Sequence, residues 1–535
     1  MKINNKIIVC LGLLSALGCT KLDQKLQDSF TSSPNSGSTD VNALLNGAYN
    51  SMNGLLHAQD QLFSLEETTT DEALIPVRGG DWDDNGVWRV LHEHTWTNIH
   101  TQMSSVFNGL GALESSAITV LAFNPSTTQG AEALFLRSLA QFYYLDLFGQ
   151  VPYRDVANYN SITASPVLNP QQAVDTLVAT LTKIIPLLPS SNSPYKASPD
   201  AARFLLMKVL LNKGAFLNKK APTFDDADMQ QVITLGQAIT NSPVGYSLTA
   251  NYFDNFGPQN ATLSKERILA WPNTGASSSN GINSGGINAR WMMTLHYNSW
   301  DKNNSYGSAG WNGFSTVADF YNMFGTADER VGGQPYPGVT NQSGLKPGFL
   351  VGQQYNEAGV AETDRQGNPL AFTQDVKLIE TDRKRLEVAG VRVIKYPPDY
   401  AAYSGGNQTN QLQIFRYADV VLMVAEAKLR SSTPDAAGAL ALVNTLRTVR
   451  GATPLASLTL VNPANVADPN TLLAERGREM YWESWRRQDL IRYGVFLTKW
   501  ALKNADEDPE KNLLFPIAPN QLLANPNLHQ NPGYE

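Results

Sequence analysis

Two stretches of this 535-residue chain place tryptophan among charged and amide side chains, which suits a ligand with both polar and flat apolar surfaces. The first is the glycine-rich segment 78–86, whose candidate contacts are Arg78, Asp81 and Trp82. The second lies at 300–312, and its candidate contacts are Trp300, Asp301, Tyr306, Trp311 and Asn312. An indole ring packs on the C–H face of a sugar, while the polar groups pair with hydroxyls. We therefore expect the two segments to build one site for a ligand such as an oligosaccharide.

Burial in the core is the alternative for each tryptophan, because large aromatic side chains are mostly buried in folded proteins. Seven of the ten tryptophans fall between residues 82 and 311. We expect Trp82, together with Trp300 or Tyr306, to stack on the ligand. A core position competes most strongly with ligand contact for Trp88, Trp96, Trp271 and Trp311.

Metal binding is not expected from the acidic and histidine-containing segments. Residues 81–86 imitate the first half of a calcium loop, but the twelfth position, normally glutamate, is His92. His92, His94 and His100 form a cluster whose spacing matches neither HExxH nor a zinc finger. We expect these histidines to be hydrogen-bonded within the fold or to contact ligand, and we expect no cofactor.

Catalysis has no clear support in the sequence. No nucleophile elbow, phosphate loop or dinucleotide fingerprint is present, so we assign no catalytic residue. A glycoside hydrolase would need two facing carboxylates, and nothing pairs the acids of this region, which are Glu66, Glu67, Asp71, Glu72, Asp81, Asp83 and Asp84. A scaffold that binds protein through helical repeats is the third reading. The net charge of -7 argues against a nucleic-acid partner.

The first 19 residues predict a lipoprotein. Lys2 and Lys6 precede an apolar run at 7–17, and Gly18-Cys19 follows, which resembles a bacterial lipobox. An ordinary secretory signal with an incidental cysteine is the alternative. We expect residues 1–18 to be a signal peptide and residues 19–40 to be a flexible tether lipidated at Cys19. Cys10 would be lost with the signal, which leaves no second thiol for a disulfide.

Helical periodicity dominates both ends of the remaining chain, which we expect to form a single domain over 41–535. Apolar residues recur at helical spacing over 41–56, 131–148, 170–188, 199–217, 226–241, 416–430, 436–450 and 471–491. Residues 243–411 are rich in Gly, Asn, Ser, Trp and Tyr and predict loops with short strands. The expected fold is mainly α: tetratricopeptide-like helix pairs form a scaffold, chiefly over 41–242 and 412–500, and the loop-rich insert forms the ligand face.

Several charges lie within these apolar helices. They are Arg137, Arg416, Asp419, Glu475, Arg476, Arg486, Arg487 and Asp489. Buried charges persist when they are paired and hydrogen-bonded. We expect most of them to form structural ion pairs between helices.

An ordered set of motifs resembles the SusD/RagB family of surface nutrient-binding lipoproteins. The motifs lie at 131–137, 147–152, 246–256, 264–266, 310–314, 328–330, 392–396, 416–420, 475–492, 516–517 and 531–534. The resemblance implies binding of an oligosaccharide without catalysis, with a peptide carrier of the RagB type as the alternative. It also implies lipid anchoring in the outer membrane, facing the cell exterior, and a SusC-like TonB-dependent transporter as partner.

Overall fold

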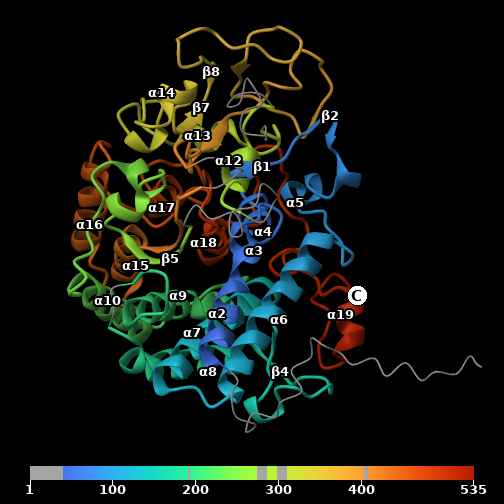
Figure 1. Ribbon diagram of the computed structural model, residues 1–535, viewed down its shortest axis with the longest axis vertical. Coiled ribbons are helices and arrows are strands. Elements are labelled where there is room, and N and C mark those ends of the chain that lie inside the picture. Colours follow the sequence, from blue (N-terminus) through green and yellow to red (C-terminus); the bar gives the residue numbers. More distant parts are fainter. Residues whose placement is uncertain (1–39, 191–192, 274–285, 298–309, 403–407) are drawn as a thin grey trace, which may run out of the picture. The chain divides into compact units, whose positions relative to one another are not determined.

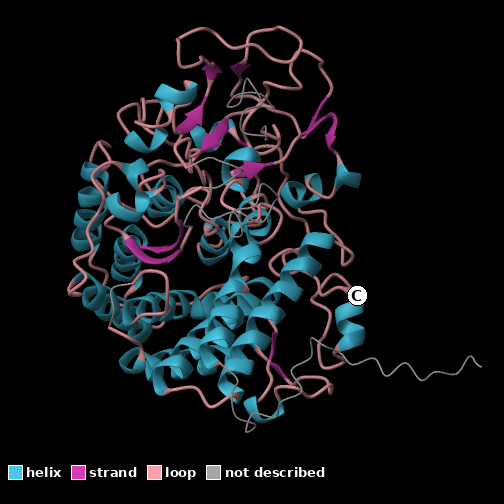
Figure 2. Cartoon of the chain, in the orientation of Figure 1, coloured by secondary structure: helices cyan, strands magenta, loops and turns pink. Residues whose placement is uncertain are grey.

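The computed structural model describes residues 40–190, 193–273, 286–297, 310–402 and 408–535. Asp40 to Glu535 form one compact unit. Helices predominate, and the strands described form small two-stranded sheets (Figures 1 and 2). The predicted mainly α fold class with a few short strands is confirmed. Tetratricopeptide-like repetition of the helix pairs stays a prediction.

Most of the N-terminal helices lie in the lower part of Figure 1, with α3 and α4 nearer the middle. They are α2 Val41–Asn50, α3 Met52–His57, α4 Leu62–Glu67, α6 Thr101–Ala122, α7 Thr127–Phe148, α8 Pro170–Ile184, α9 Pro199–Leu217 and α10 Asp226–Thr240. Successive helices pack as neighbours: α6 on α7, α8 on α9, and α9 on α10. Helix α6 was not predicted from the sequence. It is apolar and long enough to cross a membrane, and its buried face packs on α7 and α2.

Local sequence signals explain where these helices begin and end. Ser126 and Gln129 form a capping box at the start of α7, and Gly149 ends that helix in the left-handed conformation at φ 67°. Asn169 caps α8 with Pro170 in its first turn, and Ser198 caps α9. The predicted end of α7 at Gly149 and the predicted starts of α8 and α9 at Pro170 and Pro199 are confirmed, whereas α7 begins four residues before the predicted position 131.

The C-terminal helices continue the scaffold. They are α15 Tyr417–Arg430, α16 Ala436–Val449, α17 Leu472–Met480, α18 Arg486–Arg492 and α19 Pro519–Ala524. Helix α15 contacts α9, α10, α16 and α17, as expected for a helix with two apolar faces. At Gly236 in α10, an added Cβ would lie 2.3 Å from Val424 Cγ2, so glycine permits the close approach of α10 and α15.

The prediction of one helix over 471–491 is wrong, because the chain breaks between α17 and α18. Trp482 and Ser484 adopt left-handed conformations at φ 56° and 65°. This break turns the backbone N–H of Trp482 toward a carboxylate oxygen of Glu72, and that of Ser484 toward one of Glu67. Both carboxyl groups are buried, and a buried carboxyl group needs hydrogen-bond donors. Helical periodicity carries no sign of these distant acceptors.

The loop-rich part of the chain is tied together by short sheets. The pairs are β1 Ala73–Leu74 with β6 Ser315–Thr316, β2 Val77–Trp82 with β10 Ile379–Glu380, β5 Arg267–Trp271 with β12 Leu412–Arg416, β7 Gly348–Leu350 with β11 Arg392–Ile394, β8 Gly352–Gln353 with β9 Ala371–Phe372, and β3 Val151–Pro152 with β4 Val167–Leu168. Short helices connect them: α5 Arg89–Glu93, α11 Asn260–Leu263, α12 Ala289–Met292, α13 Ala318–Tyr321 and α14 Thr340–Ser343. Single 3₁₀ turns lie at Asp84–Gly86, Val156–Asn158, Ile185–Leu187, Tyr252–Asn255 and Glu329–Val331. The β2–β10 pair is parallel and the other pairs are antiparallel.

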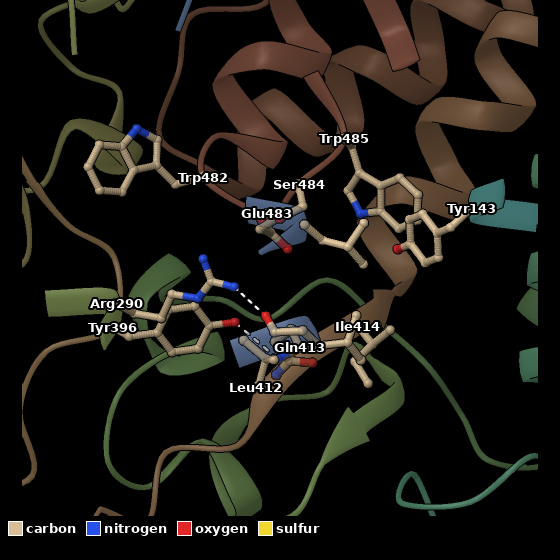
Figure 3. Close-up of a pocket in the computed structure, with 12 residues that line it drawn as sticks. Tyr143, Arg290, Tyr396, Leu412, Gln413, Ile414, Trp482, Glu483, Ser484 and Trp485 are labelled. Carbon is tan, nitrogen blue, oxygen red and sulfur yellow. Dashed lines mark hydrogen bonds between the residues drawn. The ribbon is translucent and has the colours of Figure 1, made fainter. Parts of the chain in front are cut away.

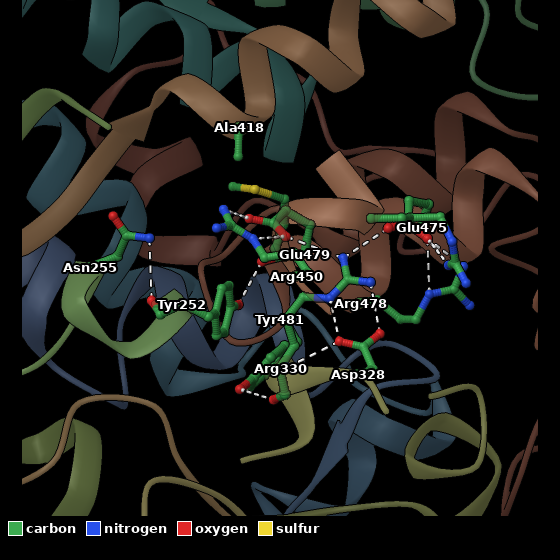
Figure 4. A network of polar contacts seen from close by, with 12 residues as sticks. Tyr252, Asn255, Asp328, Arg330, Ala418, Arg450, Glu475, Arg478, Glu479 and Tyr481 are labelled. Carbon is green, nitrogen blue, oxygen red and sulfur yellow. Dashed lines mark hydrogen bonds and ion pairs between the residues drawn. The ribbon is translucent and has the colours of Figure 1, made fainter. Parts of the chain in front are cut away.

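A buried ion-pair network centred on α17 joins the helical scaffold to the loop-rich part (Figure 4). The carboxylate of Glu479 forms ion pairs with the guanidinium groups of Arg416, at 2.7 Å, and Arg450, at 2.8 Å. All three side chains are fully or almost fully buried. Arg330 pairs with Glu475 at 2.8 Å, which brings the segment before α14 onto the same helix. Opposite charges in this network offset one another's desolvation.

The eight charges singled out in the sequence are buried, and seven of them form ion pairs. Arg476 bridges Asp419 and Asp489, while Arg416 and Glu475 belong to the network just described. The remaining paired members are Arg137 with Glu114 and Arg486 with Asp71. Arg487 differs: it donates to the carbonyl of Leu513 and lies 4.3 Å over the ring of Phe515. The prediction that most of these charges are structural is confirmed.

Candidate functional site

The structure places part of the predicted binding site and leaves part undescribed. Cys19, Trp300, Asp301 and Tyr306 lie outside the described residues. The two predicted segments nevertheless meet, because the indole N–H of Trp82 donates to the backbone carbonyl of Trp311 at 2.8 Å.

Trp82 ends strand β2 in the left-handed conformation, at φ 63°, which turns its side chain onto the second segment. Its ring packs edge-on against Phe314 and Trp88, with centroids 5.7 and 6.0 Å away. The indole lies against Gly313, where an added Cβ would meet Trp82 Cε2 at 2.3 Å. Trp82 and Trp311 are both half-buried residues.

An exposed acid–base pair lies beside Trp82. The Asp81 side chain is 55% exposed and accepts a hydrogen bond from the Tyr297 hydroxyl. The Arg365 guanidinium lies 3.7 Å over the Tyr297 ring and has one nitrogen 4.0 Å from the Asp81 carboxylate. This arrangement presents a carboxylate and a guanidinium side by side, which together can accept from and donate to neighbouring hydroxyls of one ligand.

Buried partners hold this exposed pair in place. Glu387 accepts from Arg365 Nε at 2.7 Å and contacts His296 Nε2 at 2.6 Å. Burial opposes ionisation of Glu387, but the hydrogen bonds from His296 and Arg365 outweigh it and lower the pKa of that carboxyl group. Burial also lowers the pKa of His296. A charged Glu387 therefore anchors Arg365 at the surface.

Arg78 and Asn312, predicted as direct ligand contacts, are 3% and 0% exposed. One nitrogen of the Arg78 guanidinium donates to the carbonyls of Leu386 and Ala389, and the other donates to Ser315 Oγ. The amide oxygen of Asn312 accepts from Arg392. Both side chains lie beneath the surface that carries Asp81 and Trp82, although Arg78 Nε and Asn312 Nδ2 have no hydrogen-bond partner among the described residues.

A surface cavity of about 510 Å³ follows directly on the Trp82 loop. Trp88, which packs on Trp82, forms part of its wall, and Asp84 accepts from the Trp88 indole at 2.6 Å. Ile99, which is 74% exposed, lies on its rim. The cavity thus combines apolar walls with polar groups, as small-ligand sites commonly do.

A second cavity, of about 450 Å³, lies at the β8–β9 hairpin and carries Tyr355, which is 52% exposed. Gln353 and Asn356 line it with Phe349. The wall contains no tryptophan, so it offers less stacking surface than the face around Trp82.

The acidic and histidine side chains that the sequence analysis weighed as metal ligands lie among the described residues. No group of three or more His, Cys, Asp or Glu residues there could hold a metal ion. His92, His94 and His100 each contact a backbone carbonyl, which confirms the expectation that the fold satisfies them. The acids Glu66, Glu67, Asp71 and Glu72 are buried.

Tyr297 and Arg365 are the site residues that the sequence analysis missed. Tyr297 lies three residues before Trp300, so a slightly wider window around that segment would have included it. Arg365 lies far along the chain from Asp81 and Trp82, and no residue pattern around it indicates a binding site. Trp88, Trp96 and Trp271 are buried in the core. This is the alternative to ligand contact that the sequence analysis gave for them.

Comparison with known proteins gives one consistent family. The SusD family profile matches residues 265–534. The starch-binding protein SusD of Bacteroides thetaiotaomicron is 24% identical over 516 residues, which cover 88% of this chain and 85% of that protein. A SusD superfamily protein from Parabacteroides distasonis has a similar fold, with a TM-score of 0.69 and 16% identity over 92% of this chain and 98% of that one.

A further solved structure contains a bound carbohydrate. It is the surface glycan-binding protein A of Bacteroides thetaiotaomicron in complex with laminarihexaose. The TM-score is 0.64 with 16% identity, and the match covers 92% of this chain and 98% of that one. At this identity the likeness establishes the shared fold.

Proposed function

Because this chain belongs to the SusD family, we propose that it is a cell-surface protein that binds a glycan and does not transform it. The observation that carries the proposal is the exposed face built from Trp82, Trp311, Asp81 and Arg365. This face combines aromatic surface with hydroxyl-binding groups, as a sugar requires. One relative is named for starch binding and one structural neighbour holds laminarihexaose, which supports carbohydrate as the ligand class.

We assign the ligand contacts in two groups. Trp82 and Trp311, with Trp300 or Tyr306, would stack on sugar rings. Asp81, Asp301 and Arg365 would hydrogen-bond the hydroxyls. Arg78 and Asn312 would hold the face from beneath, a role that replaces the direct contact expected from sequence and follows from their burial.

The remaining parts of the proposal concern place and partner. Cys19 would carry the lipid that anchors the chain in the outer membrane, facing the cell exterior. The partner would be a SusC-like TonB-dependent transporter, to which the bound oligosaccharide is delivered. Support comes from the lipobox-like sequence before Cys19 and from membership of the family.

Binding and catalysis can be separated in one experiment. Purified protein would be titrated calorimetrically with maltooligosaccharides, laminarioligosaccharides, a panel of other plant and microbial oligosaccharides and a mixture of peptides, and released reducing ends would be assayed in the oligosaccharide samples. We expect binding to at least one oligosaccharide and no release of reducing ends. Binding of peptides alone would favour a peptide carrier, and release of reducing ends would make the protein a hydrolase.

A further inference from the structure

Arg290 is a buried cation that forms no ion pair with the described residues. It lies in α12 and is 5% exposed. The charge of the buried Glu67 acts on it from outside ion-pair distance. One guanidinium nitrogen donates to the carbonyl of Leu56, and the guanidinium carbon lies 4.2 Å from the centroid of the Phe63 ring. The N–H groups at Nε and Nη1 have no hydrogen-bond partner in the structure.

Other buried arginines of this chain are compensated in recognisable ways. Arg78 and Arg392 also lack carboxylate partners, but backbone carbonyls and Ser315 surround their terminal nitrogens. Arg487 has unpaired N–H groups like those of Arg290, and buried carboxyl groups act on both: Asp146 and Glu66 on Arg487, and Glu67 on Arg290. Burial and the neighbouring Glu72 raise the pKa of Glu67 well above its usual range, which favours its neutral form and leaves Arg290 with little compensation.

A small cavity opens beside the unpaired edge of Arg290 (Figure 3). Its volume is about 30 Å³, which is room for a water molecule or a monatomic ion. Tyr396, Trp482 and Ser484 contribute to the wall. Figure 3 shows the Arg290 guanidinium directed from one side of this space, between Tyr396 and the Trp482–Glu483 segment.

The acid that lines the same cavity is already neutralised. One oxygen of Glu483 lies 2.7 Å from an Arg416 nitrogen and 2.6 Å from the Lys395 ammonium, and the other accepts from Arg416 Nε at 2.9 Å. With both oxygens engaged, Glu483 leaves the charge of Arg290 unbalanced. An isolated charge in a protein interior is costly, and a counter-ion relieves that cost.

We propose that this cavity binds a small monovalent inorganic anion, of the halide class, through the unpaired N–H groups of Arg290. The proposal is independent of glycan binding. The anion would also support the ligand face from below, because residues of that face are hydrogen-bonded to the segment after Arg290. The backbone N–H groups of Gly313 and Phe314 donate to the carbonyl of Met293, and that of Asn312 donates to the carbonyl of Leu295.

The direct test is anomalous diffraction from crystals of the wild-type protein soaked in bromide. We expect a bromide peak in the cavity, within hydrogen-bonding distance of the Arg290 guanidinium. A cavity that holds only water under these conditions would overturn the proposal. This arm needs no variant, so it stays decisive even where substitution of Arg290 prevents folding.

A solution experiment tests occupancy without a crystal. Chloride would be raised at constant ionic strength by replacing gluconate, which is too large for the cavity, and the Tm followed. We expect the Tm of the wild type to rise by about 1–2 °C, and the rise to be absent in Arg290→Met. Arg89→Met, which removes a partly exposed arginine paired with Glu93, serves as the control and should respond like the wild type. A wild-type Tm that does not depend on chloride would contradict the proposal.

Discussion

The indole N–H of Trp82 donates to the backbone carbonyl of Trp311 across 2.8 Å, joining segments 229 residues apart in the chain. The bond orients a tryptophan that the sequence predicts, and the structure places, beside exposed polar groups. It also joins the end of strand β2 to the segment that begins at Trp311. Within that segment, the backbone N–H groups of residues 312–314 donate to carbonyls of the segment after α12. The ligand face is thus supported by buried contacts from several distant parts of the chain, and these contacts lead to the following predictions.

Replacing Arg78 with methionine tests whether this residue supports the face or contacts ligand. Methionine keeps much of the apolar stem but leaves the carbonyl of Leu386 without its side-chain donor, whereas that of Ala389 keeps Arg392. We expect the free energy of unfolding to fall by about 2–4 kcal/mol, with glycan affinity falling as a consequence of the displaced face. Urea unfolding and calorimetry measure the two effects. Lost affinity at unchanged stability would instead show direct ligand contact.

Glu479→Gln tests the buried network on α17. The change removes the charge that opposes Arg416 and Arg450 while keeping the side-chain shape. Because breaking a buried pair leaves uncompensated charge, we expect a loss of about 3–5 kcal/mol in the free energy of unfolding. The matched control is Asp435→Asn, which affects the more exposed pair with Lys428 and should change the free energy of unfolding far less than Glu479→Gln. Equal losses in the two variants would contradict a structural role for the network.

Glu72 should make stability fall as pH rises. Burial raises the pKa of this carboxyl group to about 8, although the charge of Arg486 opposes the shift. In the unfolded chain the pKa is about 4.3. Between these two pH values the folded protein keeps a proton that the unfolded chain has released. The contribution of Glu72 to the free energy of unfolding is therefore full below the unfolded pKa and declines as the pH rises toward 8. The slope is at most about 1.4 kcal/mol per pH unit for one proton.

Glu72→Gln imitates the protonated side chain and should remove this contribution. We expect the variant to gain stability relative to the wild type at pH 8 and to gain little at pH 5, as measured by urea unfolding across that range. Glu93→Gln, at a partly exposed pair, is the control and should leave the slope unchanged. Parallel pH profiles for the wild type and Glu72→Gln would rule out a proton held by Glu72 in the folded state.

Cys19→Ser tests the proposed anchor. Without the thiol no acyl chain can be attached, so we expect loss of labelling by radioactive palmitate and a shift from the membrane fraction to the soluble fraction. Cys10→Ser provides a matched control, because the expected cleavage would remove that residue. Normal membrane association of Cys19→Ser would exclude lipidation at this cysteine.

Helix positions and helix caps could be read from the sequence because both are local signals. The capping box at Ser126 and the left-handed Gly149 mark α7 in the printed sequence itself. The break at Trp482 and Ser484 could not be read, since its cause is a pair of buried carboxyl groups more than 400 residues away. The same holds for the site: Asp81 and Trp82 are neighbours at the end of strand β2, whereas Arg365 reaches them only through the fold.

The account's central claim is that the chain binds glycan at the face around Trp82. The most direct measurement is the dissociation constant of the oligosaccharide bound most tightly by the wild type, compared between Trp82→Ala and Tyr355→Ala. Tyr355 offers a matched control because it is an exposed aromatic residue at a cavity of similar size. We predict about tenfold weaker binding in Trp82→Ala, from loss of stacking, and little change in Tyr355→Ala. Unchanged affinity in a folded Trp82→Ala variant would contradict the account.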